Sequence, residues 1–79
     1  MVAIDIPTAI ATIGAGFAIA GGAIGTGIAQ SAIGSAGLGV VAEKPEQMGI
    51  VLLLMVLPET LLIFGFVVAI LIMLAAGIV

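Results

Sequence analysis

The chain has 79 residues, of which 65% are apolar, and it carries one basic and four acidic side chains. A soluble domain of this size has too much surface to be covered by so few polar groups, so the surrounding solvent must be lipid. The net charge of −3 comes from single acids and not from a charged tail, which leaves no electrostatic support for nucleic-acid binding. The absence of cysteine and histidine excludes disulfides and thiolate or imidazole metal sites.

Two long apolar segments divide the chain. Ile6–Ala42 has no charged residue and Gln47–Val79 has one. Each exceeds the roughly 20 residues that an α-helix needs to cross the hydrocarbon core of a bilayer. We therefore predict a single all-α membrane domain, residues 1–79, with transmembrane helices at residues 5–42 and 48–78.

The first predicted helix, residues 5–42, has a typical start. Asp5 favours the positive end of the helix dipole, and Pro7 suits a first turn because its missing N–H would have no partner there. Met1–Thr8 has no basic residue, unlike the start of a cleaved signal peptide. We expect this helix to remain in the mature protein.

Small residues recur around this helix, with nine glycines in Gly14–Gly39. In lipid, small side chains allow helix backbones to approach closely. Small residues spaced by four are Gly14, Ala18 and Gly22; Gly21, Gly25 and Ala29; Gly16 and Ala20; and Gly27 and Ser31. Because they cover most of the circumference, they favour a ring or bundle with several neighbours. Close packing against the chain's own second helix is the alternative.

The polar stretch at residues 43–47 separates the two helices, and Pro45 ends the first of them. Because this loop is short, the two spans form an antiparallel hairpin with both termini on the same side. Lys44 is the sole basic residue, so the positive-inside rule places the loop in the cytoplasm and both termini outside the cell membrane.

The second predicted helix, residues 48–78, is rich in Leu, Ile, Val and Phe. Large apolar side chains suit a lipid-facing outer layer, which leaves the glycine-rich helix as the inner one. Pro58 lacks an N–H and leaves the carbonyl of Leu54 without its usual partner. A kink immediately before Glu59 is expected.

Glu59 is the only charged residue in Gln47–Val79. A carboxylate at the bilayer centre costs about 2.5–3.5 kcal/mol, so such a residue is a candidate functional site. Gln30 lies as far before the Lys44–Pro45 bond as Glu59 lies after it, so a hairpin places both at one depth. The amide can donate to the carboxylate or offer its oxygen to a cation. Thr60 adds a hydroxyl about 100° around the helix.

Structural interpretations of these three residues remain open. A purely structural ion pair at Glu59 needs a buried cation, and Lys44 lies too far along the helix. Gln30 can form a hydrogen bond between helices that is unrelated to ions. The Thr60 hydroxyl can bond back to the carbonyl of Val56, as Ser and Thr do in membrane helices.

The combined pattern resembles a known family. A glycine-rich first helix, the loop Glu43-Lys44-Pro45-Glu46 and a second helix with one central carboxylate are similar to the rotor-ring proteolipid of rotary ATP synthases and ATPases. This subunit is called c in bacterial enzymes and K in archaeal ones, and the resemblance covers essentially the whole chain. Leu57-Pro58-Glu59-Thr60 resembles the LPET segment of the archaeal and vacuolar branch.

The resemblance implies a non-catalytic subunit without a cofactor, assembled as a homo-oligomeric ring of identical hairpins. It implies that Glu59 binds the transported ion, travels through lipid in neutral form, and exchanges the ion beside an arginine of the stator membrane subunit. The loop Glu43–Glu46 would contact the central stalk, so that ring rotation couples ion flow to ATP synthesis.

The resemblance implies Na⁺ or H⁺ as the ion. The Glu59, Gln30 and Thr60 side chains match ligands of Na⁺-coupled members, and the Leu57 carbonyl matches a backbone ligand. Two departures count against Na⁺. They are Phe64, where those members often have tyrosine, and Thr26, where their pattern usually has Pro or Gly.

Other functional classes fit the residues less well. A holin-like, pore-forming peptide needs a polar stripe along a helix, and neither predicted helix has one. A protein that only packs in an assembly leaves the matching depth of Gln30 and Glu59 unexplained. An enzyme is not indicated, because one carboxylate, one amide and a few hydroxyls form no catalytic set.

Overall fold

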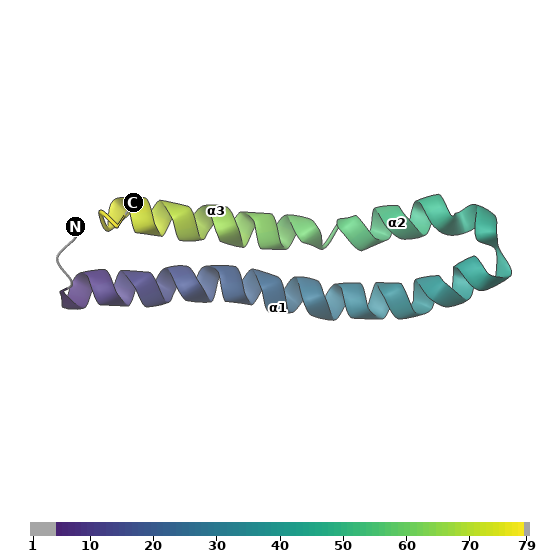
Figure 1. Ribbon diagram of the computed structural model, residues 1–79, viewed down its shortest axis with the longest axis horizontal. Coiled ribbons are helices and arrows are strands. Elements are labelled where there is room, and N and C mark those ends of the chain that lie inside the picture. Colours follow the sequence, from purple (N-terminus) through teal and green to yellow (C-terminus); the bar gives the residue numbers. More distant parts are fainter. Residues whose placement is uncertain (1–4, 79) are drawn as a thin grey trace.

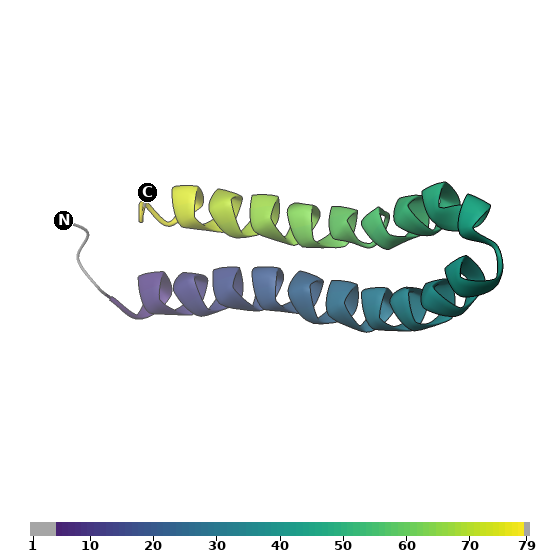
Figure 2. The same cartoon turned by 45° about the vertical axis from the view of Figure 1, so that its right-hand side comes forward.

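The computed structural model describes residues 5–78, and predictions that concern residues 1–4 or 79 lie outside this range. A long helix, α1 (Ile6–Glu43), leads through the short 3₁₀-helix η1 (Pro45–Gln47) to α2 (Met48–Val56) and α3 (Glu59–Ala75). Figure 1 shows α1 running antiparallel to α2 and α3, with the start of α1 and the end of α3 at one end of the molecule and η1 at the other. The helices remain side by side in the rotated view of Figure 2. The predicted all-α hairpin is confirmed.

The start of α1 is held by Asp5. Its Oδ1 accepts a hydrogen bond of 2.8 Å from the backbone N–H of Thr8, which satisfies one of the free donors of the first turn. Hydrogen bonding from Thr8, through its side chain and its backbone N–H, lowers the pKa of the Asp5 carboxyl. Asp5 thus acts as the cap, and the helix proper begins at Ile6 and continues to Glu43.

The end of α3 is closed by Gly77, which has a φ of +76°. Glycine adopts this left-handed conformation without the steric cost of a side chain. The N–H of Gly77 donates to the Leu74 carbonyl at 3.1 Å, and the N–H of Ile78 donates to the Met73 carbonyl at 2.9 Å. This is the Schellman arrangement, so the helix ends shortly before the predicted limit at residue 78.

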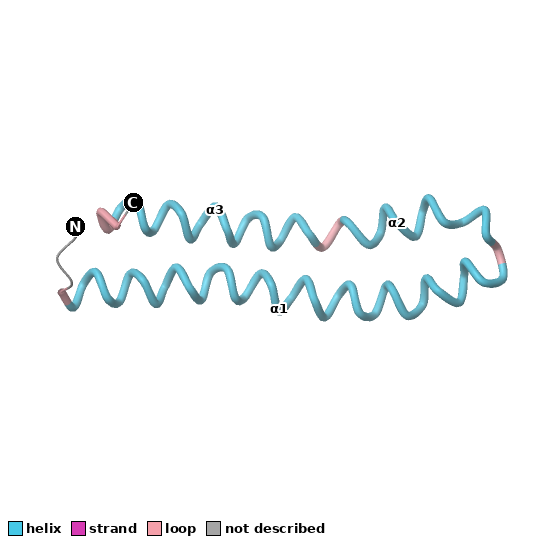
Figure 3. Tube along the Cα trace, in the orientation of Figure 1, coloured by secondary structure: helices cyan, strands magenta, loops and turns pink. Residues whose placement is uncertain are grey.

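The second span is interrupted at Leu57 and Pro58, which appear as a loop segment between α2 and α3 in Figure 3. Proline has no N–H to continue the helical ladder. The chain turns more tightly here. The N–H of Thr60 donates to the Leu57 carbonyl at 3.2 Å, and that of Leu61 donates to the Pro58 carbonyl at 3.0 Å, three positions back in each case.

Glycines allow the backbones of α1 and α3 to touch near the middle of the hairpin. A Cβ atom on Gly65 would lie 2.5 Å from the Ala18 carbonyl oxygen, and one on Gly22 would lie 2.8 Å from that of Leu61. Distances under 3.0 Å to backbone atoms are not seen for real Cβ atoms. Even a methyl group would therefore force the two helices apart.

Most glycines of α1 lie outside this contact. Of the nine in Gly14–Gly39, three have atoms of the second span near their Cβ positions, namely Gly22, Gly34 and Gly37. The other six have nothing within 4 Å, and they are Gly14, Gly16, Gly21, Gly25, Gly27 and Gly39. Packing within the hairpin therefore accounts for a minority of them.

The exterior of the hairpin is apolar. Among described residues, Ala15, Thr26, Gly37 and Ala69 are buried, whereas most large apolar side chains are exposed. Two stretches, Ile6–Glu43 and Pro45–Ala75, are long and apolar enough to cross a membrane. The molecule is 58 Å long, compared with about 40–45 Å for a bilayer with its headgroup regions. Such a surface is suited to lipid or to further apolar helices.

Candidate ion-binding site

The structure brings Gln30 of α1 into contact with Glu59, the first residue of α3. The Nε2 of Gln30 donates a hydrogen bond of 2.7 Å to Oε2 of Glu59. The contact joins residues at one depth of the antiparallel hairpin, and Glu59 lies near the middle of the apolar stretch Pro45–Ala75. The residues chosen from their equal distance to the loop are thus neighbours in space.

A second hydrogen bond fixes how the Gln30 amide is turned. Its Nε2 also donates to the backbone carbonyl of Met55, at 3.0 Å. A flipped amide would set its oxygen against that carbonyl, so that two acceptors would face each other. Gln30 therefore presents N–H groups to Glu59 and Met55, and its Oε1 forms no hydrogen bond with a group in residues 5–78.

Thr26 lies one helical turn before Gln30 and also reaches the second span. Its Oγ1 donates a hydrogen bond of 2.8 Å to the backbone carbonyl of Pro58. The residue is only 3% exposed. From the sequence, Thr26 was noted only as a departure from the family pattern, and this contact was missed. The available signal was its spacing of four from Gln30, which places both side chains on one face of α1.

Thr60 and Leu57 interact with each other. The Oγ1 of Thr60 donates to the Leu57 carbonyl at 2.8 Å, and the N–H of Thr60 donates to the same oxygen at 3.2 Å. The backbone acceptor is therefore Leu57, three residues back, and not Val56 as the alternative interpretation had it. The Leu57 oxygen already accepts two hydrogen bonds, whereas the Thr60 hydroxyl keeps its own oxygen lone pairs.

The Glu59 carboxylate is exposed on the surface of the single hairpin, at the first turn of α3. The positive end of the α3 dipole favours negative charge at this position. Phe64, the departure noted above, is 68% exposed and has no hydroxyl to offer. Within residues 5–78, the group that forms a hydrogen bond with the carboxylate is therefore the Gln30 amide.

The loop lies far from this site, at the end of the hairpin opposite the start of α1 and the end of α3 (Figure 1). The N–H of Lys44 caps α1 by donating to the Val40 carbonyl at 2.7 Å, and η1 begins at Pro45. The side chains of Glu43, Lys44 and Glu46 are exposed. They are free to contact another protein.

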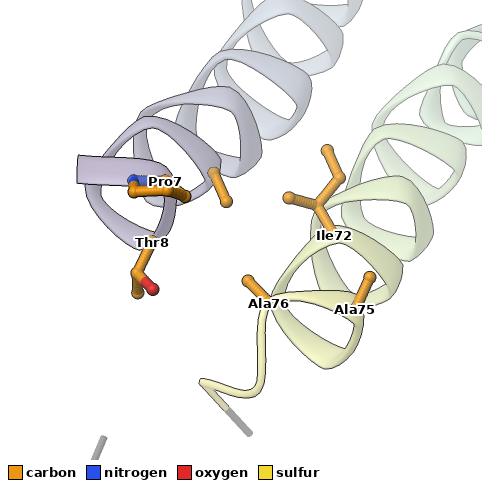
Figure 4. A pocket seen from close by; sticks show the side chains of 6 residues that line it. Pro7, Thr8, Ile72, Ala75 and Ala76 are labelled. Atoms are coloured by element: carbon orange, nitrogen blue, oxygen red, sulfur yellow. The ribbon is translucent and has the colours of Figure 1, made fainter. Parts of the chain in front are cut away.

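A groove at the opposite end of the hairpin lies between the first turns of α1 and the last turns of α3 (Figure 4). Its lining residues are Pro7, Thr8, Ala11, Ile72, Ala75 and Ala76. Thr8 supplies the only polar side chain of this lining, and no carboxylate lines the groove. The groove therefore does not compete with Glu59 as a place for a cation.

Comparison with known proteins gives the family. The family model that describes the C subunit of ATP synthase matches residues 13–72, a range that includes Thr26, Gln30 and Glu59. The chain belongs to the ATP synthase C-subunit family. The resemblance drawn from the sequence is confirmed, and with its two long apolar helices this ATP synthase C-subunit family protein is a membrane protein. A holin-like function is not favoured.

One relative narrows the likeness to the archaeal branch. This ATP synthase C-subunit family protein is 40% identical, over 67 residues, to the K subunit of the A-type ATP synthase of Methanocaldococcus jannaschii. The matched region covers 85% of this chain and 30% of the relative. The chain thus spans less than a third of the length of the curated relative that it matches.

Proposed function

We propose that this chain is the ion-translocating, non-catalytic rotor subunit of an A-type ATP synthase. Glu59 binds Na⁺ or H⁺ within the membrane, and rotation of a ring of identical copies couples ion flow to ATP synthesis. The observation that carries the proposal is the 2.7 Å hydrogen bond from Gln30 to Glu59 at mid-span, in a chain of the ATP synthase C-subunit family.

The contact explains how a carboxyl group can travel through lipid. A bare carboxylate at the bilayer centre is costly, so the group needs a proton or a bound cation. Gln30 donates to Oε2 of Glu59, which leaves the other carboxyl oxygen to carry the proton or contact the cation. Release then requires a competing positive charge, which an arginine of the stator subunit would provide by making the ionised form favourable.

The oxygen atoms near Glu59 define what Na⁺ would use. A hard cation takes several oxygen ligands. Oε1 of Gln30 and the hydroxyl oxygen of Thr60 keep acceptor capacity beside the carboxylate. The Leu57 carbonyl would have to give up one of its two hydrogen bonds to join them. A proton needs no such rearrangement. The protection experiment below distinguishes Na⁺ from H⁺.

The proposed assembly follows from the surfaces of the hairpin. The six open glycines of α1 offer flat faces for neighbouring copies, and the bulky residues of α2 and α3 face lipid. We expect α1 to lie on the inner side of the ring. The loop Glu43–Glu46 lies in the cytoplasm and contacts the central stalk, and both termini lie on the outer side of the cell membrane.

Labelling with an apolar carbodiimide tests the function. We expect the reagent to modify Glu59 in native membranes and to block ATP-coupled ion movement, because the modified carboxyl can no longer exchange its ion. Protection by Na⁺ but not by K⁺ at fixed pH identifies Na⁺, and protection by raised pH alone identifies H⁺. Modified rings that still couple ion movement to ATP would contradict the proposal.

Gln30→Leu is expected to change the ion affinity of Glu59 about 10- to 100-fold. Na⁺ binding should weaken because the Oε1 ligand is lost, whereas proton binding should strengthen because the ionised carboxylate loses an N–H donor. The change removes the hydrogen bond to Glu59 and leaves the Met55 carbonyl without its side-chain partner, and a bond to a charged group contributes about 1.5–3 kcal/mol. The midpoint of cation protection against carbodiimide measures the effect. Gln47→Leu, the same substitution in η1, is the control and should leave the midpoint unchanged. Equal midpoints for the two variants would refute the role of Gln30.

A further inference from the structure

Thr26 is the one polar residue that is buried within residues 5–78, and its hydroxyl does not bond to its own helix. Thr12, on the same helix, donates to the Thr8 carbonyl four residues back, which is the usual choice for threonine in membrane helices. Thr26 instead donates across to the Pro58 carbonyl at 2.8 Å. Its hydroxyl therefore joins two segments of the hairpin.

Together, Thr26 and Gln30 hold both sides of the interruption. Gln30 binds the carbonyl of Met55, which belongs to α2, and Thr26 binds the carbonyl of Pro58, which caps the start of α3. The two side chains are one turn apart on an unbroken helix. The uninterrupted α1 thus fixes the separation of α2 and α3 at the point where proline has removed one backbone hydrogen bond of the helix.

We propose that Thr26 is a positioning residue for the ion site, which rests on the proposed function of Glu59. Pro58 immediately precedes Glu59, so the hydrogen bond from Thr26 sets where the carboxyl meets the Gln30 amide. Without the hydroxyl, the Pro58 carbonyl keeps only its bond from the Leu61 N–H and the start of α3 is free to shift.

The hydroxyl is not required to hold the two helices together. The backbone contacts of Gly22 with Leu61 and of Gly65 with Ala18 bring α1 and α3 together on their own. Removal of the Thr26 hydroxyl is therefore expected to leave the hairpin folded while it loosens the site. The loss of one such hydrogen bond predicts about a three- to tenfold change in ion affinity, which is a loss of affinity where the ion is Na⁺.

Two pairs of rings, each pair differing chiefly by one hydroxyl, test the proposal. The first compares wild type with Thr26→Val, which keeps the branched shape. The second compares Thr26→Ser with Thr26→Ala. Assembled rings are labelled with an apolar carbodiimide while Na⁺ is titrated at fixed pH, and again while pH is varied without Na⁺, and the protection midpoint of Glu59 is measured.

The expected result is that the hydroxyl-free member of each pair has a Na⁺ midpoint about three- to tenfold weaker than its partner, or a pH midpoint shifted by an equivalent three- to tenfold change in proton affinity. Thr12→Val should match wild type, because that hydroxyl bonds only within α1. Midpoints that agree within about twofold in each pair would overturn the proposal. If Thr26→Val does not assemble, the comparison of Thr26→Ser with Thr26→Ala decides in the same way.

A second measurement separates this inference from the function itself. A ¹³C label on the Pro58 carbonyl reports its hydrogen bonding by solid-state NMR in rings, whether or not they move ions. Its chemical shift should change in Thr26→Val and stay the same in Thr12→Val. An unchanged shift in Thr26→Val overturns the positioning role. Absence of ion-dependent protection in wild-type rings, with the carbonyl shift changed as expected, rejects the proposed function instead.

Discussion

Replacing Glu59 with glutamine is expected to reduce ion-driven ATP synthesis to the background of vesicles without the enzyme. The amide side chain has nearly the same shape, and its oxygen can accept the hydrogen bond that Gln30 now donates to Oε2. The ring should therefore assemble normally. Glutamine cannot gain or lose a proton, however, and it carries no charge to hold a cation, so each copy passes through the membrane without cargo.

The measurement is ATP synthesis by the reconstituted enzyme under an imposed ion gradient, with ring assembly checked on the same preparation. Asp5→Asn also replaces an acid by an amide, keeps a side chain that can cap α1, and should leave synthesis near the wild-type rate. Glu59→Asp keeps the acid on a shorter side chain and should retain part of the activity. Synthesis at the wild-type rate in an assembled Glu59→Gln ring would refute the proposed function.

Gly65→Ala is expected to destabilise the hairpin by about 1–3 kcal/mol, the usual cost of overpacking. The new methyl group would lie 2.5 Å from the carbonyl oxygen of Ala18, and a backbone atom cannot turn aside as a flexible side chain can. The helices must separate at this point. Because Gly65 is in α3, we also expect the contact from Thr26 to Pro58 to lengthen, so that stability and ion binding fall together.

Thermal unfolding of the detergent-solubilised chain measures the first effect, and carbodiimide protection of Glu59 measures the second. Gly22→Ala should behave in the same way, because its Cβ would meet Leu61 at 2.8 Å. Gly49→Ala is the matched control, because nothing lies within 4 Å of its Cβ position. A Gly65→Ala protein as stable as the Gly49→Ala protein would show that the close approach of α1 and α3 is not required.

The shared depth of Gln30 and Glu59 in the hairpin was predictable because α-helices have a fixed rise per residue. Two antiparallel helices joined by a short loop place residues at equal distances from that loop side by side, which is how Gln30 was matched to Glu59. The hairpin itself followed from the length of the apolar segments and the short polar stretch at residues 43–47. These inferences depend only on helix geometry and on the thickness of the bilayer.

The details around Pro58 were less accessible. The sequence indicated that the Leu54 carbonyl loses its usual partner, but it did not indicate that side chains of α1 bind the carbonyls of Met55 and Pro58. A proline in the sequence shows which backbone N–H is missing. Which backbone carbonyls the side chains of α1 reach depends on how α1 is rotated about its axis. Thr26 was overlooked for the same reason, since its role depends on the face that α1 turns toward the second span.

The unequal continuity of the two arms has a mechanical consequence. The arm formed by α1 is unbroken from Ile6 to Glu43, whereas the opposite arm has a joint at Leu57 and Pro58. A sideways force applied to the loop would therefore be transmitted mainly through α1, and not through the interruption at Leu57 and Pro58. Since Thr26 and Gln30 bind carbonyls on both sides of the joint, the Glu59 carboxyl would move together with the loop end of the hairpin.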